Sequence, residues 1–172
     1  MEYQDVFVLA GLYDGQAQAR MDFDQLGQMH KQKVIGRYQA AIFEKQPDGK
    51  VKVLDTTSTT RTTGAKWGAA IGAAIGLVFP PALIATAAEG AAIGAIAGNL
   101  SKGWFKGDVK SLGEELQPGE AGVVAVTEAG PAIDERTLLT TARKTQKEHV
   151  TGEDADKMKQ QLESEQPVGA AR

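Results

Sequence analysis

The chain has 172 residues, a formal net charge of -3 at pH 7 and no cysteine. Its length suits one domain, and its nearly neutral charge argues against a nucleic-acid-binding protein that neutralises phosphates. The absence of cysteine excludes disulfides, thiolate metal ligands and cysteine nucleophiles.

The first sixty residues predict a strand, a helix and a hairpin. Residues 5–13, DVFVLAGLY, form an apolar run rich in strand-forming residues that ends at Asp14-Gly15, which predicts a buried strand. In the next stretch Ala19, Phe23, Leu26 and His30 recur at helical spacing, which predicts an amphipathic helix. Two runs rich in strand-forming residues then flank Gln46-Pro47-Asp48-Gly49, whose Pro-Asp-Gly sequence is typical of a turn.

The most apolar segment of the chain, residues 64–100, contains two rows of glycines spaced four residues apart. Residues four apart share one face of a helix, so each row predicts a smooth groove. Each glycine costs about 1 kcal/mol of helix stability relative to alanine. We expect close packing between small-residue faces to offset this cost. The predicted helix-packing residues are Gly64, Gly68, Gly72, Gly76, Gly90, Gly94 and Gly98.

Phe79, Pro80 and Pro81 lie between the two glycine rows. A double proline cannot continue a helix, because it removes two hydrogen-bond donors and clashes with the preceding turn. It is well suited to the first turn of a new helix. The segment therefore predicts two helices, over about residues 63–78 and 81–100, joined as a hairpin.

The remaining third predicts a short helix, a strand and two further helices. Residues 106–120, KGDVKSLGEELQPGE, indicate a short helix that ends at Pro118-Gly119, and residues 121–129, AGVVAVTEA, indicate a second buried strand. Asp134 is placed to cap a helix through residues 135–150, and a last short helix follows Gly152.

Taken in order, these elements predict an α+β fold. We expect a ferredoxin-like βαββαβ sheet domain with an inserted glycine-zipper helical hairpin and C-terminal helices. The predicted parts are residues 1–60 and 107–130 for the sheet domain, 61–106 for the insert, 131–164 for the C-terminal helices and 165–172 for a disordered tail.

The sequence allows two environments for the hairpin, a lipid membrane or the interior of a protein assembly. The 22 residues from Trp67 to Ala88 carry no formal charge, and about 20 apolar residues cross a bilayer. Lys66 and Lys102 fall at the same end of the hairpin, as do Arg61 and Lys106, and this end is predicted to be cytoplasmic. Trp67 and Trp104 fall at that level as predicted interfacial residues.

Other features favour a hairpin buried against the sheet or in an oligomer. The prolines fall mid-segment, and Glu89 interrupts the second helix. A carboxylate at bilayer depth costs roughly 2.5 kcal/mol or more unless it is paired, protonated or turned to protein. Glu89 is therefore a possible buried charge: it is either rotated toward headgroups or water, or it lines a shared polar interior and tunes assembly with pH.

Patterns typical of catalysis are weak. We expect His30 to be structural and His149 to be solvated on a charged helix, and neither has metal-ligand spacing to carboxylates. Phosphate-binding glycine motifs and a nucleophile elbow are absent. Asp22 and Asp24 are interpreted as a charged helix surface. The sequence therefore predicts a non-enzymatic protein with no catalytic residue, metal, cofactor or identifiable small-molecule substrate.

The order of five pieces resembles a family of small predicted bacterial membrane proteins of unknown function. The pieces are VFVLAGLYD, the hairpin YQAAIFEKQPDGKVKVLDTT, the glycine-rich segment, LGEELQPGEAGVVAVTE and the helix after it, over roughly residues 5–145. The resemblance implies a split ferredoxin-like domain around a central apolar segment, inner-membrane association and no known catalytic residues. This chain departs from the family in being alanine-rich across the insert and in carrying Glu89.

Two functions are therefore expected. In the first, the hairpin anchors the protein to the inner (cytoplasmic) membrane and mediates homo-oligomerisation, while the α+β domain faces the cytoplasm as an interaction surface. In the alternative, the protein is a soluble cytoplasmic homo-oligomer, of stress or scaffold type, with its glycine zippers buried between subunits.

Overall fold

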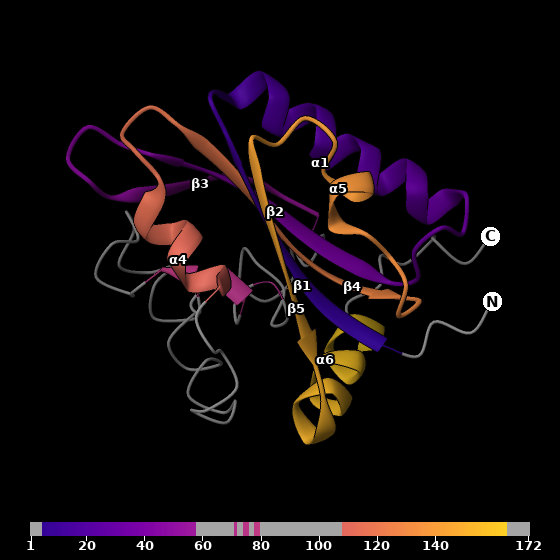
Figure 1. Ribbon diagram of the computed structural model, residues 1–172. Coiled ribbons are helices and arrows are strands. Elements are labelled where there is room, and N and C mark those ends of the chain that lie inside the picture. The colour runs from indigo at the N-terminus through magenta and orange to yellow at the C-terminus, as the bar shows by residue number, and fades with distance from the viewer. Residues whose placement is uncertain (1–4, 58–70, 72–73, 76–77, 80–107, 165–172) are drawn as a thin grey trace.

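The fold is organised around one five-stranded antiparallel sheet in the order β3-β2-β4-β1-β5. The computed structural model describes residues 5–57, 71, 74–75, 78–79 and 108–164 (Figure 1). The predicted α+β class is confirmed. In chain order the elements are β1 (Asp5–Tyr13), α1 (Gln16–Lys31), β2 (Tyr38–Lys45), β3 (Val51–Thr56), α4 (Asp108–Glu115), β4 (Ala121–Ala129), α5 (Glu135–Leu138), β5 (Lys144–Val150) and α6 (Gly152–Ser164).

The two apolar runs expected to be buried strands, β1 and β4, lie side by side in the middle of the sheet. They pair antiparallel from Asp5↔Ala129 to Tyr13↔Ala121, and every residue of β4 is buried. Strands covered on both faces read as continuous apolar runs rather than alternating ones, because both side-chain directions point into a core. Both predicted strands are confirmed with the bounds that the sequence indicated.

Helices cover both faces of the sheet, as Figure 1 shows with α1 and α5 on one side and α4 and α6 on the other. Successive side chains of a strand point to opposite faces. In β1, Phe7 and Leu9 therefore join the core under α1, whereas Val6 and Val8 join the core under α4 and α6. The described residues between 71 and 79 belong to the core under α4 and α6, together with Val6 and Val8.

The predicted helix and hairpin of the first sixty residues are also confirmed. α1 buries Ala19, Phe23 and Leu26, as its spacing predicted. At the hairpin turn Gly49 has φ +84°, which favours glycine, and its N–H donates to the Gln46 carbonyl at 2.9 Å. A β-bulge interrupts the β2–β3 pairing between Ile42 and Phe43.

The prediction of a helix through residues 135–150 is wrong beyond Leu138. Asp134 caps α5 as predicted, accepting from the Arg136 N–H at 2.9 Å, but α5 is only four residues long. Residues 144–150 form β5, which pairs with β1 from Val6↔Val150 to Leu12↔Lys144. Pairing with a partner strand overrides weak local propensity. The region 131–164 is therefore not composed of helices alone, and β5 belongs to the sheet.

Candidate functional site

The described residues of the central segment form an apolar helical face. Ile71, Ala74, Ile75, Val78 and Phe79 follow the spacing i, i+3, i+4, i+7 and i+8, and each is at most 2% exposed. The first four are helical, and the Phe79 N–H donates to the Ile75 carbonyl at 2.9 Å. This spacing is that of one helix face against a core.

That face packs on β2 and α4. The Phe79 ring meets Phe43 of β2 edge to face, with centroids 4.7 Å apart. The Ile71 N–H donates to the Oε1 of buried Gln39 at 3.1 Å. A Cβ at Gly113 of α4 would lie 2.3 Å from the Val78 carbonyl oxygen, so glycine permits this approach of α4. Phe79, predicted as part of a hairpin turn, is thus a core residue of the sheet domain.

The other predicted site residues lie outside the described residues. They are Gly64, Gly68, Gly72, Gly76, Gly90, Gly94, Gly98, Pro80, Pro81, Trp67, Trp104, Lys66, Lys102 and Glu89. Among the helices in the described ranges, none combines the length and the apolar character needed to cross a bilayer.

A buried carboxylate, Asp22, joins three separate parts of the fold. It lies on α1 and is fully buried. The Tyr13 hydroxyl of β1 donates to its Oδ2 at 2.9 Å. From the connection between α5 and β5, the Thr141 N–H donates to the same oxygen at 3.0 Å and the Thr140 hydroxyl donates to Oδ1 at 3.3 Å. These donors compensate for the loss of hydration that a buried carboxylate suffers.

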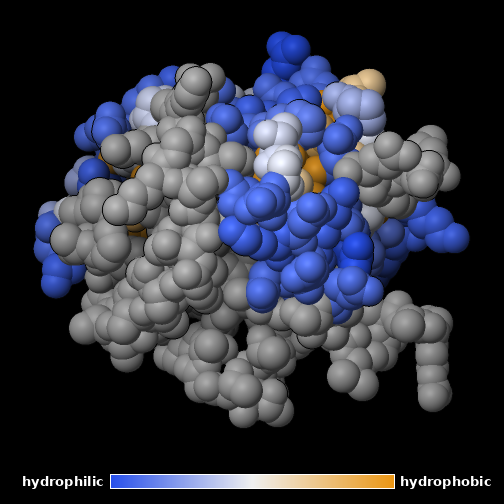
Figure 2. Space-filling view, turned by 90° about the horizontal axis from the view of Figure 1, so that it is seen from below, coloured by the Kyte–Doolittle hydropathy of each residue, from blue (hydrophilic) through white to orange (hydrophobic). Residues whose placement is uncertain are grey.

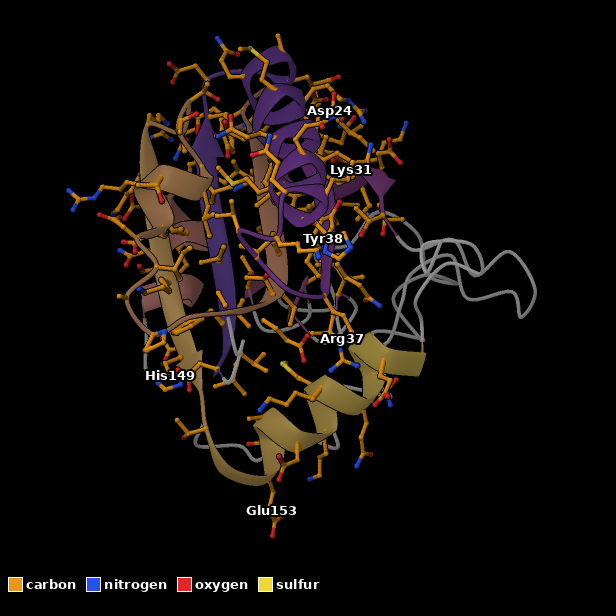
Figure 3. The ribbon with its side chains drawn as sticks, turned by 90° about the vertical axis from the view of Figure 1, so that its right-hand side faces the viewer. Asp24, Lys31, Arg37, Tyr38, His149 and Glu153 are labelled. Carbon is orange, nitrogen blue, oxygen red and sulfur yellow. The ribbon has the colours of Figure 1, made fainter. Side chains whose placement is uncertain are left out.

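The sequence did not identify Asp22 as special, although a signal was present. Asp22 lies three residues after Ala19, beside Phe23 and four residues before Leu26, in the middle of the apolar stripe of α1. A carboxylate in such a stripe indicates a buried polar contact. Asp24, in contrast, is exposed, and Figure 3 shows it on the outer side of α1, so the two do not form a dyad.

The environment of Tyr13 keeps its hydroxyl protonated. Burial raises the pKa of Tyr13 far above its ordinary value, and the charge and hydrogen bond of Asp22 raise it further. Tyr13 therefore acts as a hydrogen-bond donor to Asp22 over the pH range in which an exposed tyrosine would begin to ionise.

We expect Tyr13→Phe to remove part of the alkaline loss of stability. Because the folded pKa is raised, the unfolded chain loses this proton first, near its ordinary pKa of about 10. The wild-type free energy of unfolding should then fall by up to about 1.4 kcal/mol per pH unit for this group above that pH. Burial also raises the pKa of Tyr38, and this contribution is the same in both proteins.

Urea unfolding at pH 8, 10 and 11 measures the difference between the two proteins. The variant should be less stable at pH 8, by about 1 kcal/mol or more, because it lacks the hydrogen bond to Asp22. The gap should narrow as the pH rises. A constant gap would contradict the assigned environment of Tyr13.

The two histidines have structural contacts. As predicted, His30 is structural: its Nδ1 lies 2.7 Å from the Gly36 carbonyl oxygen. The prediction of His149 on a helix is wrong, because it lies on β5 with its ring stacked on Phe7 at 4.9 Å and its Nε2 3.2 Å from Asp5. Within the described residues, no three histidine or acidic side chains are grouped so as to hold a metal ion.

An arginine clamp joins β2, β4 and α6 on the face opposite α1. Arg37, just before β2, donates through Nε and Nη2 to the two oxygens of Glu128 at 2.8 and 2.7 Å. Its Nη1 lies 3.6 Å from Glu163 of α6. Figure 3 shows Arg37 close to the end of α6. The buried pair with Glu128 ties the start of β2 to β4, whereas the contact with Glu163, whose side chain is 75% exposed, contributes little to holding α6.

The surface of the described part is mainly polar. Among the coloured residues on the face that Figure 2 shows, hydrophilic ones dominate, and hydrophobic ones are visible only in small areas between them. In the described ranges the exposed large hydrophobic side chains are Met21 and Val34. These two isolated side chains do not constitute an apolar docking patch.

A family model with the description "Protein of unknown function (DUF1269)" matches residues 65–164. Comparisons with curated proteins and with solved structures found no match. The matched range begins after β3 and extends through α6, so it includes the last helix, which the sequence resemblance had left outside. The expected resemblance to a family of unknown function is confirmed at this level.

Proposed function

Since the chain belongs to the DUF1269 family of proteins of unknown function, we propose its role from its own residues: it is a non-enzymatic protein that self-associates through its central glycine-rich segment. The observation that carries this proposal is the burial of Ile71, Ala74, Ile75, Val78 and Phe79 in the sheet core. It fixes one apolar face of the predicted first helix to a rigid domain. The two glycine rows then provide small-residue contacts between copies.

The soluble form of this proposal has the stronger support. Side chains that are at most 2% exposed against β2 and α4 contact protein rather than lipid. We therefore favour a homo-oligomeric cytoplasmic scaffold, in which the glycine rows pack between subunits.

Membrane association is the second candidate. The uncharged run from Trp67 to Ala88 favours it, together with the flanking Lys66 and Lys102 and the aromatic Trp67 and Trp104. In this form the hairpin attaches the protein to the inner membrane and the sheet domain faces the cytoplasm.

We further propose that β1, β2, β4 and β5, with α1 and α5, make a ferredoxin-like core. The order β2-β4-β1-β5 supports it, because α1 links β1 to β2 across β4, and α5 links β4 to β5 across β1. This is the split βαβ pattern. In this assignment β3 is an added edge strand, and the last strand is β5 rather than the predicted β4.

The double variant Gly72→Leu with Gly94→Leu tests self-association. The two leucines fill the predicted grooves, so we expect the variant to be a monomer where the wild type is an oligomer. Size-exclusion chromatography with light scattering measures the two masses. The matched control is Ala73→Leu with Ala95→Leu, which adds the same volume about 100° away on each predicted helix. If the glycine variant keeps the wild-type mass, the proposal is wrong.

Fractionation of cells separates the two environments. The scaffold form predicts the protein in the supernatant without detergent. The membrane form predicts it in the membrane pellet after carbonate washing.

A further inference from the structure

We propose that Asp22 is a latch that holds the start of β5 on the edge of β1, and that β5 peels away from its Lys144 end when the latch is lost. The latch is the buried contact between the Asp22 carboxylate and the Thr141 N–H, three residues before β5 begins. Thr141 also donates through its hydroxyl to the Gln18 carbonyl of α1 at 2.9 Å. The connection into β5 is thus fixed to α1.

The side chains of β5 hold it weakly. Of its seven residues, Val150 alone is buried. Its lysines form long or partly exposed ion pairs, Lys144 with Glu115 and Lys147 with Glu135, and His149 stacks on Phe7 with its Nε2 3.2 Å from Asp5. Exposed ion pairs contribute little, because water and salt screen them. A buried hydrogen bond to a carboxylate is worth more than any one of these pairs.

The far end of β5 is held differently. Val150 lies in the core together with Met158 and Leu162 of α6, and the Arg37–Glu163 pair lies at the end of that helix. Because apolar packing holds the Val150 end and Asp22 holds the Lys144 end, loss of the latch frees one end only. β5 then opens directionally, which uncovers the edge of β1 first at Leu12.

The backbone amides of β1 can distinguish this opening from global unfolding. In antiparallel pairing, alternate residues bond to opposite neighbours. The Arg143 N–H donates to the Leu12 carbonyl at 2.9 Å, so Leu12 faces β5. By alternation Val6, Val8 and Ala10 face β5 as well, whereas Phe7, Leu9 and Gly11 face β4. The latch therefore protects one set of β1 amides and not the other.

Hydrogen exchange of the Asp22→Asn variant, followed by NMR, tests the proposal. Asparagine has the same shape, but its NH2 group takes the place of one carboxylate oxygen. This group cannot accept the hydrogen bonds that Tyr13, Thr140 and Thr141 donate in the wild type. We expect protection of the Leu12 and Ala10 amides to fall about tenfold to a hundredfold. The fall should be smaller at Val6, and the amides that face β4 should keep wild-type protection. The matched control is Asp24→Asn, which removes the same charge from the exposed side of α1.

Two results would overturn the latch. One is equal loss at both sets of β1 amides, which indicates global destabilisation. The other is no loss at Leu12 and Ala10. If Asp22→Asn does not fold, Thr141→Pro decides by the same amides, because proline keeps Asp22 in place but has no N–H to donate to it. Wild-type protection at Leu12 and Ala10 in that variant contradicts the proposal. The readout is within one molecule and does not depend on self-association.

Discussion

Phe79→Ala should lower the free energy of unfolding by about 3–5 kcal/mol. The ring is 1% exposed and lies edge to face against Phe43 of β2. Its removal takes apolar surface out of the core and leaves a cavity that β2 and α4 cannot fill without moving. Urea unfolding of the purified chain, followed by circular dichroism, gives the value.

The matched control for this variant is Met21→Ala. Met21 is 61% exposed, so its truncation should change stability by less than about 0.5 kcal/mol. A double-mutant cycle with Phe43→Ala isolates the contact between the rings, for which we expect about 0.5–1.5 kcal/mol of coupling. Unchanged stability of Phe79→Ala would mean that the central segment is not part of the sheet core. The scaffold form of the proposed function would then lose its support.

Arg37→Ala should cost about 2–3 kcal/mol. The side chain of Glu128 is 7% exposed. Truncation of Arg37 removes both guanidinium hydrogen bonds to this buried carboxylate, and of the donors that Arg37 supplies only its backbone N–H, at 3.2 Å, remains. Breaking a buried pair costs about 3–5 kcal/mol, and we lower this value because Arg37 itself is 32% exposed. Thermal and urea unfolding measure the loss.

Arg20→Ala is the matched control for the arginine clamp. Arg20 and Asp55 are 2.6 Å apart, against 2.7 Å for the clamp, but their side chains are 45% and 48% exposed. Exposed pairs contribute about 0–1 kcal/mol, so this variant should be nearly neutral. Equal losses in the two variants would show that burial does not set the strength of these pairs. The Glu128→Gln variant should partly rescue Arg37→Ala, because a neutral amide is easier to bury than a charge.

The family match and the packing of the central segment bear on different parts of the chain. The match covers residues 65–164 and therefore not β1, α1, β2 or β3. The described residues of the central segment nevertheless pack on β2, which lies outside the matched range. In this chain the family segment thus folds against strands contributed by the preceding residues.

The local sequence determined the elements whose own residues carry the signal. β1 and β4 are apolar along their whole lengths, α1 has an apolar stripe at helical spacing, and Pro-Asp-Gly fixes the turn of the β2–β3 hairpin. Each of these signals arises within a few residues, from side-chain burial or from backbone restriction at glycine and proline. The α+β class followed from them.

Only the tertiary structure decided β5, the place of β4 and the role of Asp22. The residues of β5 have no apolar period, and they form a strand because the edge of β1 offers backbone hydrogen bonds to them. The position of β4 between β1 and β2 depends on pairing with strands that lie far earlier in the chain. Asp22 is buried because Tyr13 and Thr141 bring donors from elsewhere to it. The apolar stripe of α1 marks Asp22 as buried, but no local pattern of residues reports which donors the tertiary fold brings to it.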